Sequence, residues 1–444
     1  MPLTHLVERP PDAALFRTPA GVVTPPQFLA DAHAAARALP DGAFLVNLCR
    51  DRYAFAVAFA AALLRERVCL LPGDASHARL AALAIQFPGC TAAVDLPDPS
   101  LPIPCATVQP RGAAASAIEG GGGGAANPAL PGGQVAAVVF TSGSTGTPVG
   151  HTKLWGALAG RSRAAAQAFG FGDAAPPSVV GTVPPGHMYG FETTVLLPLH
   201  APASSWCGPA FYPGDIAAAL AAVPAPRILV TTPLQLRGLG ASRPPLPPVH
   251  AAISATAPLD AALALQAEQA LGAPVLEIFG ATEVGSIARR RTTEGEWWHG
   301  YPGVTIRCGA DATLVDAPWT DPTPLADELD IEVSGRFRLL GRRADLVKLG
   351  GRRASLSGLN SILLALDGVA DGAFVVPDDL GQRANARLMA VVVAPCRSAE
   401  AILADLRARL DPLFLPRRVL HVDALPRNAL GKLPRQALLA LLQG

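Results

Sequence analysis

The stretch that decides the fold is residues 135–148, which read VAAVVF (135–140) followed by TSGSTGTP (141–148). The first six residues are apolar and valine-rich, as in a strand buried on both faces of a sheet. The next eight are small or polar. They leave main-chain N–H groups free and let an anion approach them closely. This junction predicts a loop that holds phosphate oxygens at the end of a buried strand.

Strands and helices alternate on both sides of this junction. Residues 45–72 read as strand, apolar helix and strand, and a helix is expected over residues 154–169. Further strands are expected at 178–183, 227–232, 250–256 and 274–280. The alternation predicts an α/β protein with a large, layered, mostly parallel N-terminal domain. Residues 111–134 are of low complexity and are expected to form a flexible surface loop.

The pattern changes after about residue 340. A turn at 345–351, a helix near 357–366, strands at 373–376 and 389–394, and a helix over 399–410 form a compact set. We therefore predict two domains: a core of residues 1–344 that binds ATP and the acid, and a small mobile α+β domain of residues 345–444.

The composition excludes several classes of function. A net charge of +1 gives no electrostatic reason to expect a nucleic acid or an anionic membrane as partner. The longest apolar run, residues 53–64, is too short to span a bilayer. The seven cysteines are scattered without a CxxC pair, which favours reduced thiols over disulfides or zinc ligands. The start of the chain lacks the order of a signal peptide. These features together indicate a cytoplasmic enzyme.

Lysine is rare in this chain. Lys and Arg together number 36, and only Lys153, Lys348 and Lys432 are lysines, so 33 are arginines. We infer that Arg serves wherever plain positive charge suffices. The three lysines are therefore candidates for roles that need a compact ammonium group.

The loop after residue 140 has its own chemical identity. Its hydroxyl side chains add donors to the main-chain N–H groups, and the GxxxxGK[ST] spacing of a Walker loop is absent. TSGSTGTP after a strand resembles the phosphate loop of the adenylate-forming superfamily, which comprises acyl- and aryl-CoA ligases, peptide-synthetase adenylation domains and luciferases. The resemblance implies that the triphosphate of ATP is held by Thr141, Ser142, Gly143, Ser144, Thr145 and Gly146.

Five further segments resemble this superfamily in the same order along the chain. They are HMYG (187–190), ATAPL (255–259), FGATE (279–283), an Asp upstream of GRRAD (341–345), and LPRNALGKLPR (425–435). For the acid, the resemblance implies contacts from His187, Tyr189, Gly190, Ser254 and Thr256. For the nucleotide it implies Ala257, Phe279, Gly280, Asp327 (on the ribose) and Arg342.

The resemblance also assigns the reaction. Thr282 is expected to reach the phosphate or the substrate carboxylate, and Glu283 to help hold Mg²⁺. Lys432 is the expected catalytic lysine, because it bridges two anions while the carboxylate attacks the α-phosphate. The small domain then swings about the hinge residue Asp345. Lys348 and Gly351 are expected to border the tunnel of the attacking thiol.

The phosphate loop departs from the family at Val149, where a lysine is usual. Lys153 lies four residues on, at the expected start of a helix, where positions i and i+4 share one face. We hypothesise that Lys153 reaches back and replaces the missing loop cation. Met188 stands where amino-acid activators carry an Asp, which argues against an α-amino acid. His187 with Tyr189 favours an aromatic acid.

The acceptor stays open at this point. The short frame resembles bacterial ligases that load hydroxybenzoates onto an acyl carrier protein for xanthomonadin or aryl-polyene pigments. Arginines of the small domain could meet an acidic carrier; they are Arg407, Arg409, Arg417, Arg418 and Arg427. Free CoA is the rival acceptor. A non-catalytic nucleotide-binding relative is an alternative of another class, motivated by the loss of the loop lysine.

Overall fold

The computed structural model describes residues 2–73, 75–113, 125–141, 149–309, 312–342, 346–349, 352–377, 387–427 and 433–442. The chain divides into two compact units, which are described separately below. The first contains Met1–Ala255, Ala261–Thr305 and Val315–Thr323, and the second contains Thr256–Asp260, Ile306–Leu314 and Pro324–Gly444. A separate C-terminal domain is thus confirmed. Its predicted boundary between residues 344 and 345 stays a prediction.

The first unit contains a six-stranded sheet of order β10-β9-β5-β4-β6-β7, parallel except at β10. Strand β4, helix α2 and strand β5 form the predicted strand–helix–strand unit, with β4 and β5 parallel. The strands are β4 (Phe44–Asn47), β5 (Val68–Leu71), β6 (Thr91–Val94), β7 (Cys105–Thr107), β9 (Val135–Thr141) and β10 (Val149–Leu154).

The second sheet of this unit has nine strands in the order β17-β16-β15-β14-β13-β11-β12-β2-β3. The six strands from β15 to β2 are parallel, which confirms the predicted α/β class. The strands are β2 (Phe16–Thr18), β3 (Gly21–Val23), β11 (Ser178–Gly181), β12 (Ser204–Trp206), β13 (Arg227–Thr231), β14 (Ala251–Ser254), β15 (Val275–Ala281), β16 (Gly285–Arg291) and β17 (His299–Gly300).

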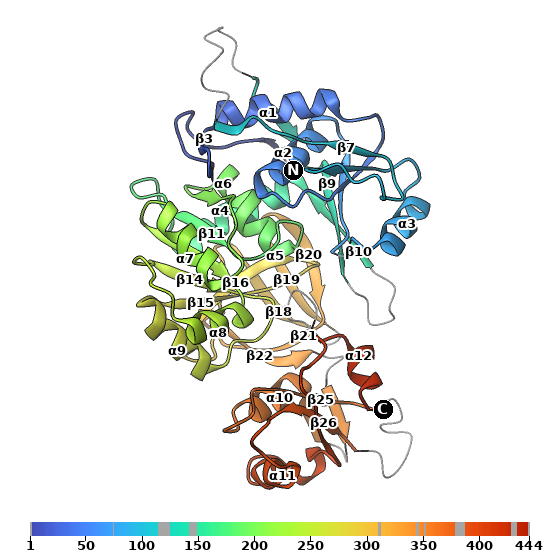
Figure 1. Ribbon diagram of the computed structural model, residues 1–444, viewed down its shortest axis with the longest axis vertical. Helices are drawn as coiled ribbons and strands as arrows, with labels where there is room; N and C mark the ends of the chain where they lie inside the picture. The colour runs from blue at the N-terminus through green and yellow to red at the C-terminus, as the bar shows by residue number, and fades with distance from the viewer. Residues whose placement is uncertain are drawn as a thin grey trace. The chain divides into compact units, whose positions relative to one another are not determined.

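Helices cover both sheets of the first unit. Helix α2 is buried on every side, as expected for a helix that is apolar all round. Helices α8 and α9 lie side by side, and α9 contacts β15 (Figure 1). The helices are α1 (Pro25–Ala38), α2 (Arg52–Leu64), α3 (His77–Gln86), α4 (Trp155–Phe169), α5 (Met188–Gly190), the π-helix η2 (Phe191–Leu196), α6 (Leu197–His200), α7 (Pro213–Ala222), α8 (Pro233–Ser242), α9 (Ala261–Leu271) and the short 3₁₀ turn η3 (Thr292–Glu294).

The C-terminal part of the chain follows the predicted order of elements. Helices α10 and α11 pack with β25 and β26 around a core that includes Leu363, Val392 and Ile402. The elements are β21 (Asp327–Ile331), β22 (Phe337–Arg342), β23 (Leu346–Leu349), β24 (Arg352–Ser355), α10 (Leu356–Leu364), β25 (Asp371–Val375), β26 (Met389–Val393), α11 (Ala399–Arg407), the 3₁₀ turn η5 (Pro412–Phe414), β27 (Val419–His421) and α12 (Arg435–Ala440). A three-stranded sheet precedes them: β18 (Thr305–Cys308), β19 (Thr313–Ala317) and β20 (Thr320–Leu325).

One expected loop is partly a strand. Residues 111–134 were expected to form a flexible surface loop, but β8 (Ala129–Pro131) within them pairs antiparallel with β1 (Leu3–His5). The main-chain hydrogen bonds to β1 supply order that the composition of this stretch does not predict. Residues 114–124 lie outside the described residues.

Several arginines use the planar guanidinium as well as the charge, a role that the count of arginines does not predict. Arg52 is buried and donates to the carbonyls of Trp206 (2.7 Å), Gly181 (3.0 Å) and Val183 (2.9 Å). Arg65, Arg67 and Arg227 likewise each donate to two or more main-chain carbonyls. A fork with five donors in fixed, planar directions suits carbonyls that lie on different sides of the guanidinium.

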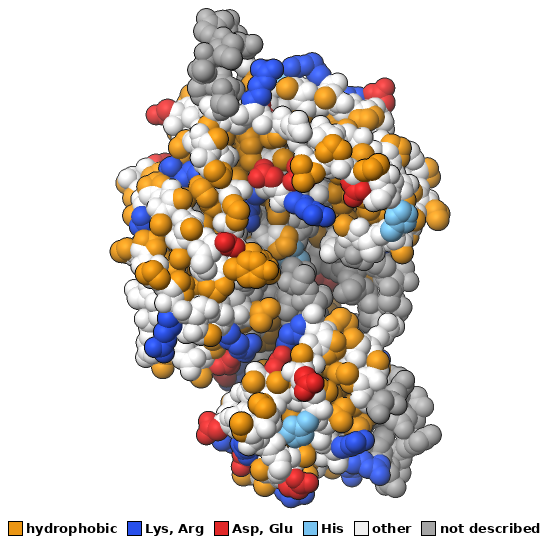
Figure 2. Space-filling model, in the orientation of Figure 1, with side chains coloured by type: hydrophobic (Ala, Val, Ile, Leu, Met, Phe, Trp, Pro, Cys, Tyr) orange, Lys and Arg blue, Asp and Glu red, His pale blue; other side chains and the backbone are white. Residues whose placement is uncertain are grey.

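The surface carries both signs of charge. On the face drawn in Figure 2, Lys and Arg side chains are interspersed with Asp and Glu side chains over both units. Among the described residues, six cysteines carry free thiols, four of them buried and two exposed. Among the described residues no helix has both the length and the apolar character needed to cross a bilayer.

Candidate active site

The site is built around the turn that joins β15 to β16. These strands are antiparallel, with a register shift between Phe279 and Gly280. The Val284 N–H closes the turn on the Ala281 carbonyl at 3.1 Å. A Cβ at Gly280 would lie 2.3 Å from the Gly285 carbonyl oxygen, so the main chains pass too close for any other residue. The FGATE motif is therefore a tight reversal at which the parallel sheet ends.

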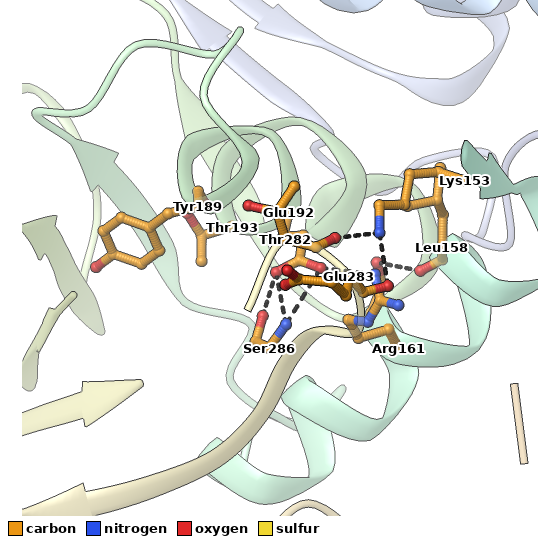
Figure 3. A network of polar contacts seen from close by, with 10 residues as sticks. Lys153, Leu158, Arg161, Tyr189, Glu192, Thr193, Thr282, Glu283 and Ser286 are labelled. Atoms are coloured by element: carbon orange, nitrogen blue, oxygen red, sulfur yellow. Dashed lines mark hydrogen bonds and ion pairs between the residues drawn. The ribbon is translucent and has the colours of Figure 1, made fainter. Parts of the chain in front are cut away.

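Lys153 holds the middle of this turn. It lies on β10, its side chain is buried, and its Nζ donates to the main-chain carbonyls of Thr282 and Glu283, the latter at 2.9 Å (Figure 3). Burial, with a smaller contribution from Arg161, lowers the pKa of Lys153 to about 8. The expectation that Lys153 begins a helix was wrong. On a strand, Val149 and Lys153 are about 13 Å apart, so the i,i+4 argument for reaching the phosphate loop does not hold.

A buried ion pair holds the end of the turn. Arg161 of α4 lies 2.7 Å from Glu192 of η2, and both side chains are almost fully buried. The Glu192 carboxylate also accepts hydrogen bonds from Ser286 N–H at 3.2 Å and from the Ser286 hydroxyl. Gly285, with φ of +73°, leaves the space that the pair occupies. Figure 3 shows this network as continuous with the turn that Lys153 contacts.

The helix that presents Glu192 is irregular for a reason visible in its hydroxyl groups. Thr193 donates to the carbonyl of Tyr189, and Thr194 donates to the carbonyl of Gly190, both at 2.6 Å. Such bonds to the residue four positions earlier compete with the helical N–H donors and distort the helix. The result is the π-helical turn η2, a form that is frequent at functional sites.

An apolar pocket lies beside this network, wholly within the first unit. Its enclosed volume in this structure is about 20 Å³, and the wider hollow around it is open to solvent. Most of its wall is aromatic or aliphatic. The Arg161 Nε–H is buried without a hydrogen-bond partner among the described residues. The polar lining residues are Arg161, Ser162, Glu192, Thr193, Ser286 and Tyr301. The apolar lining is Phe169, Phe171, Val179, Leu197, Ile228, Val230, Ile253 and Ile278.

The predicted acid-binding residues of the first unit lie close to this pocket in the fold. Tyr189 is buried and donates its hydroxyl to the carbonyl of the pocket residue Ile253 at 2.7 Å, and burial raises its pKa well above the usual range. A Cβ at Gly190 would lie 2.1 Å from the Pro184 carbonyl, which explains the glycine of HMYG. His187 occupies the position just before the short helix α5 and makes no side-chain capping hydrogen bond there. Ser254 ends β14 with its hydroxyl buried and unpaired among the described residues.

The predicted nucleotide residues fall in different places. Phe279 is buried and packs on Trp298 with ring centroids 5.5 Å apart. In the second unit, the register of β21 and β22 places Asp327 directly opposite Arg342. The sequence predicted a nucleotide contact for each separately, and the structure brings them into one cross-strand pair. Thr256 belongs to this unit with Ala257, and it has φ of +79°, which is unusual for a β-branched residue.

The remaining predicted residues lie wholly or partly outside the described residues. For Thr141, Arg342 and Lys348 the structure gives the strands β9, β22 and β23 without their side chains. Eight other predicted residues lie outside the described residues. They are Ser142, Gly143, Ser144, Thr145 and Gly146 of the phosphate loop, the hinge residue Asp345, the tunnel residue Gly351 and the catalytic lysine Lys432. Their roles stay predictions.

The residues of the turn fit a Mg²⁺ ion shared with phosphates. Glu283 is exposed at the tip of the turn, so its carboxylate can take part in a metal shell. Mg²⁺ prefers one or two carboxylates together with phosphate oxygens and water. When bound there, the ion would neutralise phosphate charge during attack on the α-phosphate.

Sequence reasoning missed most of the polar network. Arg161 and Ser286 lie 31 and 94 positions from Glu192, and no spacing rule relates such residues. The one available signal was Glu192, the single charged residue in the stretch 188–199 that follows His187. A buried carboxylate needs hydrogen-bonding partners, so Glu192 could have predicted that partners exist but not which residues they are.

The comparisons with known proteins agree with this geometry. Residues 26–334 match the family of AMP-binding enzymes. The chain is 32% identical over 306 residues to a 4-coumarate–CoA ligase of Rhodobacter capsulatus, covering 67% of this chain and 74% of the relative. It is 34% identical over 310 residues to a 4-coumarate–CoA ligase of Halorhodospira halophila, covering 66% and 73%. The crystal structure of ATP-bound MatB from Rhodopseudomonas palustris superimposes with a TM-score of 0.78 at 22% identity, over 96% of this chain and 95% of MatB.

The chain therefore belongs to the AMP-binding, adenylate-forming enzymes. It is an ATP-dependent, AMP-forming acid–thiol ligase, and the alternative of a non-catalytic relative is set aside.

Proposed function

We propose that the enzyme activates an aromatic carboxylic acid of the hydroxybenzoate type as its acyl-adenylate and transfers the acyl group to a phosphopantetheine thiol. The observation that carries this proposal is the pocket beside the FGATE turn. Its walls are apolar and include two phenylalanines, and its polar groups gather around Arg161, Glu192 and Ser286. Two relatives named as 4-coumarate–CoA ligases, whose named substrate is an aromatic acid, also support it.

The polar groups suit a ring hydroxyl better than a plain ring. Arg161 Nε–H is a buried donor without a partner among the described residues, and Tyr301, whose hydroxyl is also buried without such a partner, is another residue of the pocket wall. A pocket that can hydrogen-bond a hydroxyl discriminates against an analogue that lacks one, because the pocket's own groups then stay unpaired. We therefore expect hydroxylated benzoates to be preferred over benzoate by at least about tenfold in kcat/KM.

The first half-reaction is displacement at phosphorus. A carboxylate oxygen of the acid attacks the α-phosphate of ATP, and the bond to the departing pyrophosphate breaks. Both reactants are anions, so catalysis consists mainly of alignment and charge neutralisation. Lys432 is proposed to supply the mobile cation. Removing one such donor typically costs about 10²–10³ in rate, so Lys432→Ala should lose adenylate formation and keep its fold.

The second half-reaction is attack by a thiol on the acyl carbon of the adenylate, which releases AMP and the thiol proton. The relatives named as CoA ligases favour free CoA as the acceptor. An acyl carrier protein is the second candidate, favoured by four arginines exposed near α11 and β27 in the second unit: Arg407, Arg409, Arg417 and Arg418. Arg427 forms a bidentate ion pair with Asp371, so its charge contributes less to a surface that would bind an acidic carrier protein.

The test is ATP–pyrophosphate exchange across a panel of acids. The panel contains benzoate, 3- and 4-hydroxybenzoate, 4-coumarate, a medium-chain fatty acid and proline, each assayed with wild type and Lys432→Ala. Exchange that depends on a hydroxylated aromatic acid supports the proposal. Exchange confined to the fatty acid or to proline would refute it. Adding CoA or a phosphopantetheinylated carrier protein to the adenylate then decides which thiol accepts the acyl group.

A further inference from the structure

Lys153 is an unusual buried cation because its partners are peptide groups. Its side chain is 3% exposed, and both of its hydrogen-bond acceptors are main-chain carbonyls, those of Thr282 and Glu283. Main-chain carbonyls of a turn have no strand or helix partner, so their partner is either water or a donor from another part of the chain, as it is here. In a chain with three lysines, one of them serves this turn.

Two different elements make hydrogen bonds to the turn between β15 and β16. Lys153 on β10 holds residues 282 and 283, and Glu192 on η2 holds Ser286 through its main-chain N–H and its hydroxyl. The main chains of Gly280 and Gly285 pass so close to each other that the turn between them has little room to move. A shift of the Lys153 side chain would therefore be passed to the main chain of Thr282 and Glu283.

We propose that Lys153 is a positioning residue whose ammonium group fixes the main chain of Thr282 and Glu283 for catalysis. This inference rests on the proposed function, since Thr282 and Glu283 act in catalysis only if ATP and an acid bind at the turn. It replaces the sequence-based hypothesis that Lys153 substitutes for the loop cation missing at Val149. Val149 begins the same strand, and its side chain is half exposed.

The experiment compares three variants with wild type in pyrophosphate exchange. Lys153→Met removes the donors, Lys153→Gln keeps two N–H donors without the charge, and the double variant Val149→Lys/Lys153→Met returns a cation to the loop only. Arg163→Met is the matched control. It removes an exposed cation of the neighbouring helix α4 whose partner is Glu8.

A misplacement of about 1 Å in a catalytic group can cost about 10²-fold in rate. We therefore expect kcat of Lys153→Met to fall about 10²-fold while the KM for the acid changes less than threefold. Lys153→Gln should recover at least a tenth of wild-type kcat, and the double variant should stay as slow as Lys153→Met. Arg163→Met should match wild type. Recovery of the double variant would overturn the inference in favour of a loop cation, and so would wild-type kcat in Lys153→Met.

A second measurement separates this inference from the proposed function. Hydrogen exchange of the peptide covering residues 279–288, without substrates, reports the turn itself. We expect at least tenfold faster exchange in Lys153→Met than in wild type or Arg163→Met, with unchanged exchange in peptides of α8 and α9. Equal exchange in Lys153→Met and wild type would overturn the positioning role. If wild type shows no ATP–pyrophosphate exchange with any acid, the proposed function is refuted. The hydrogen-exchange comparison would still decide the role of Lys153.

Discussion

Substitution of Gly285 by alanine tests the buried ion pair behind the catalytic turn. A Cβ at this position would lie 2.4 Å from both Arg161 Cζ and Glu192 Oε1, and φ is +73°. The left-handed backbone costs a non-glycine residue about 1–2 kcal/mol. Breaking a buried ion pair costs about 3–5 kcal/mol more, because each charge is left without its partner. We therefore expect Gly285→Ala to lower the free energy of unfolding by about 4–7 kcal/mol.

Gly272→Ala is the matched control. Gly272 also has a positive φ, +60°, but a Cβ there would meet nothing within 4 Å. This variant should lose only the backbone cost, about 1–2 kcal/mol. Urea unfolding followed by tryptophan fluorescence measures both variants. With a slope of about 3 kcal/mol per M, the two midpoints should differ by about 1–2 M. Equal midpoints would refute the reasoning, because they would mean that the ion pair tolerates a methyl group at Gly285.

Three further predictions concern single buried side chains. Burial lowers the pKa of His200 from 6.5 to about 4, so wild type should lose up to about 3 kcal/mol of stability as the pH falls from 6.5 to 4. His200→Phe should lack this loss in melting curves at pH 7, 5.5 and 4.5, and an identical acid slope in the two proteins would contradict the prediction. Arg52→Lys leaves at least one of the three carbonyls unpaired and should lower the urea-derived free energy of unfolding by about 1–3 kcal/mol. An unchanged urea midpoint would show that the Arg52 guanidinium does not contribute this stability. Tyr189→Phe removes the bond to the Ile253 carbonyl and should cost about 1 kcal/mol in the same assay, where no loss would argue against that bond.

Most of the architecture was predictable from local sequence pattern. The runs that became β11, β13 and β14 are almost entirely buried, and their small and apolar residues are typical of strands inside a parallel sheet. Strand β15 alternates buried and partly buried residues, which is also a strand pattern. The strand before the phosphate loop, β9, was predicted for the same reason. The motif order then placed HMYG and FGATE near one pocket, where Tyr189 contacts Ile253.

Strand β10 could not be predicted in this way. Its residues VGHTKL include four that are polar or glycine, so the apolar pattern of a strand is missing. The four-residue spacing from Val149 to Lys153 fits a helix as well as it fits a strand. The strand forms because Val149–Leu154 pairs with β9. It tolerates a buried lysine because carbonyls from a turn 129 positions away accept its hydrogen bonds. Those partners exist only in the folded chain, so Lys153 was misassigned to a helix.

The Arg52 fork also bears on how long the folded state lasts. It links α2 to carbonyls 129, 131 and 154 positions away in sequence. Contacts across such long loops close only after much of the chain entropy has been lost, so they form late in folding. An interaction that is absent from the transition state slows unfolding and leaves the folding rate nearly unchanged. We therefore expect removal of the Arg52 guanidinium to speed unfolding of the first unit more than it slows folding.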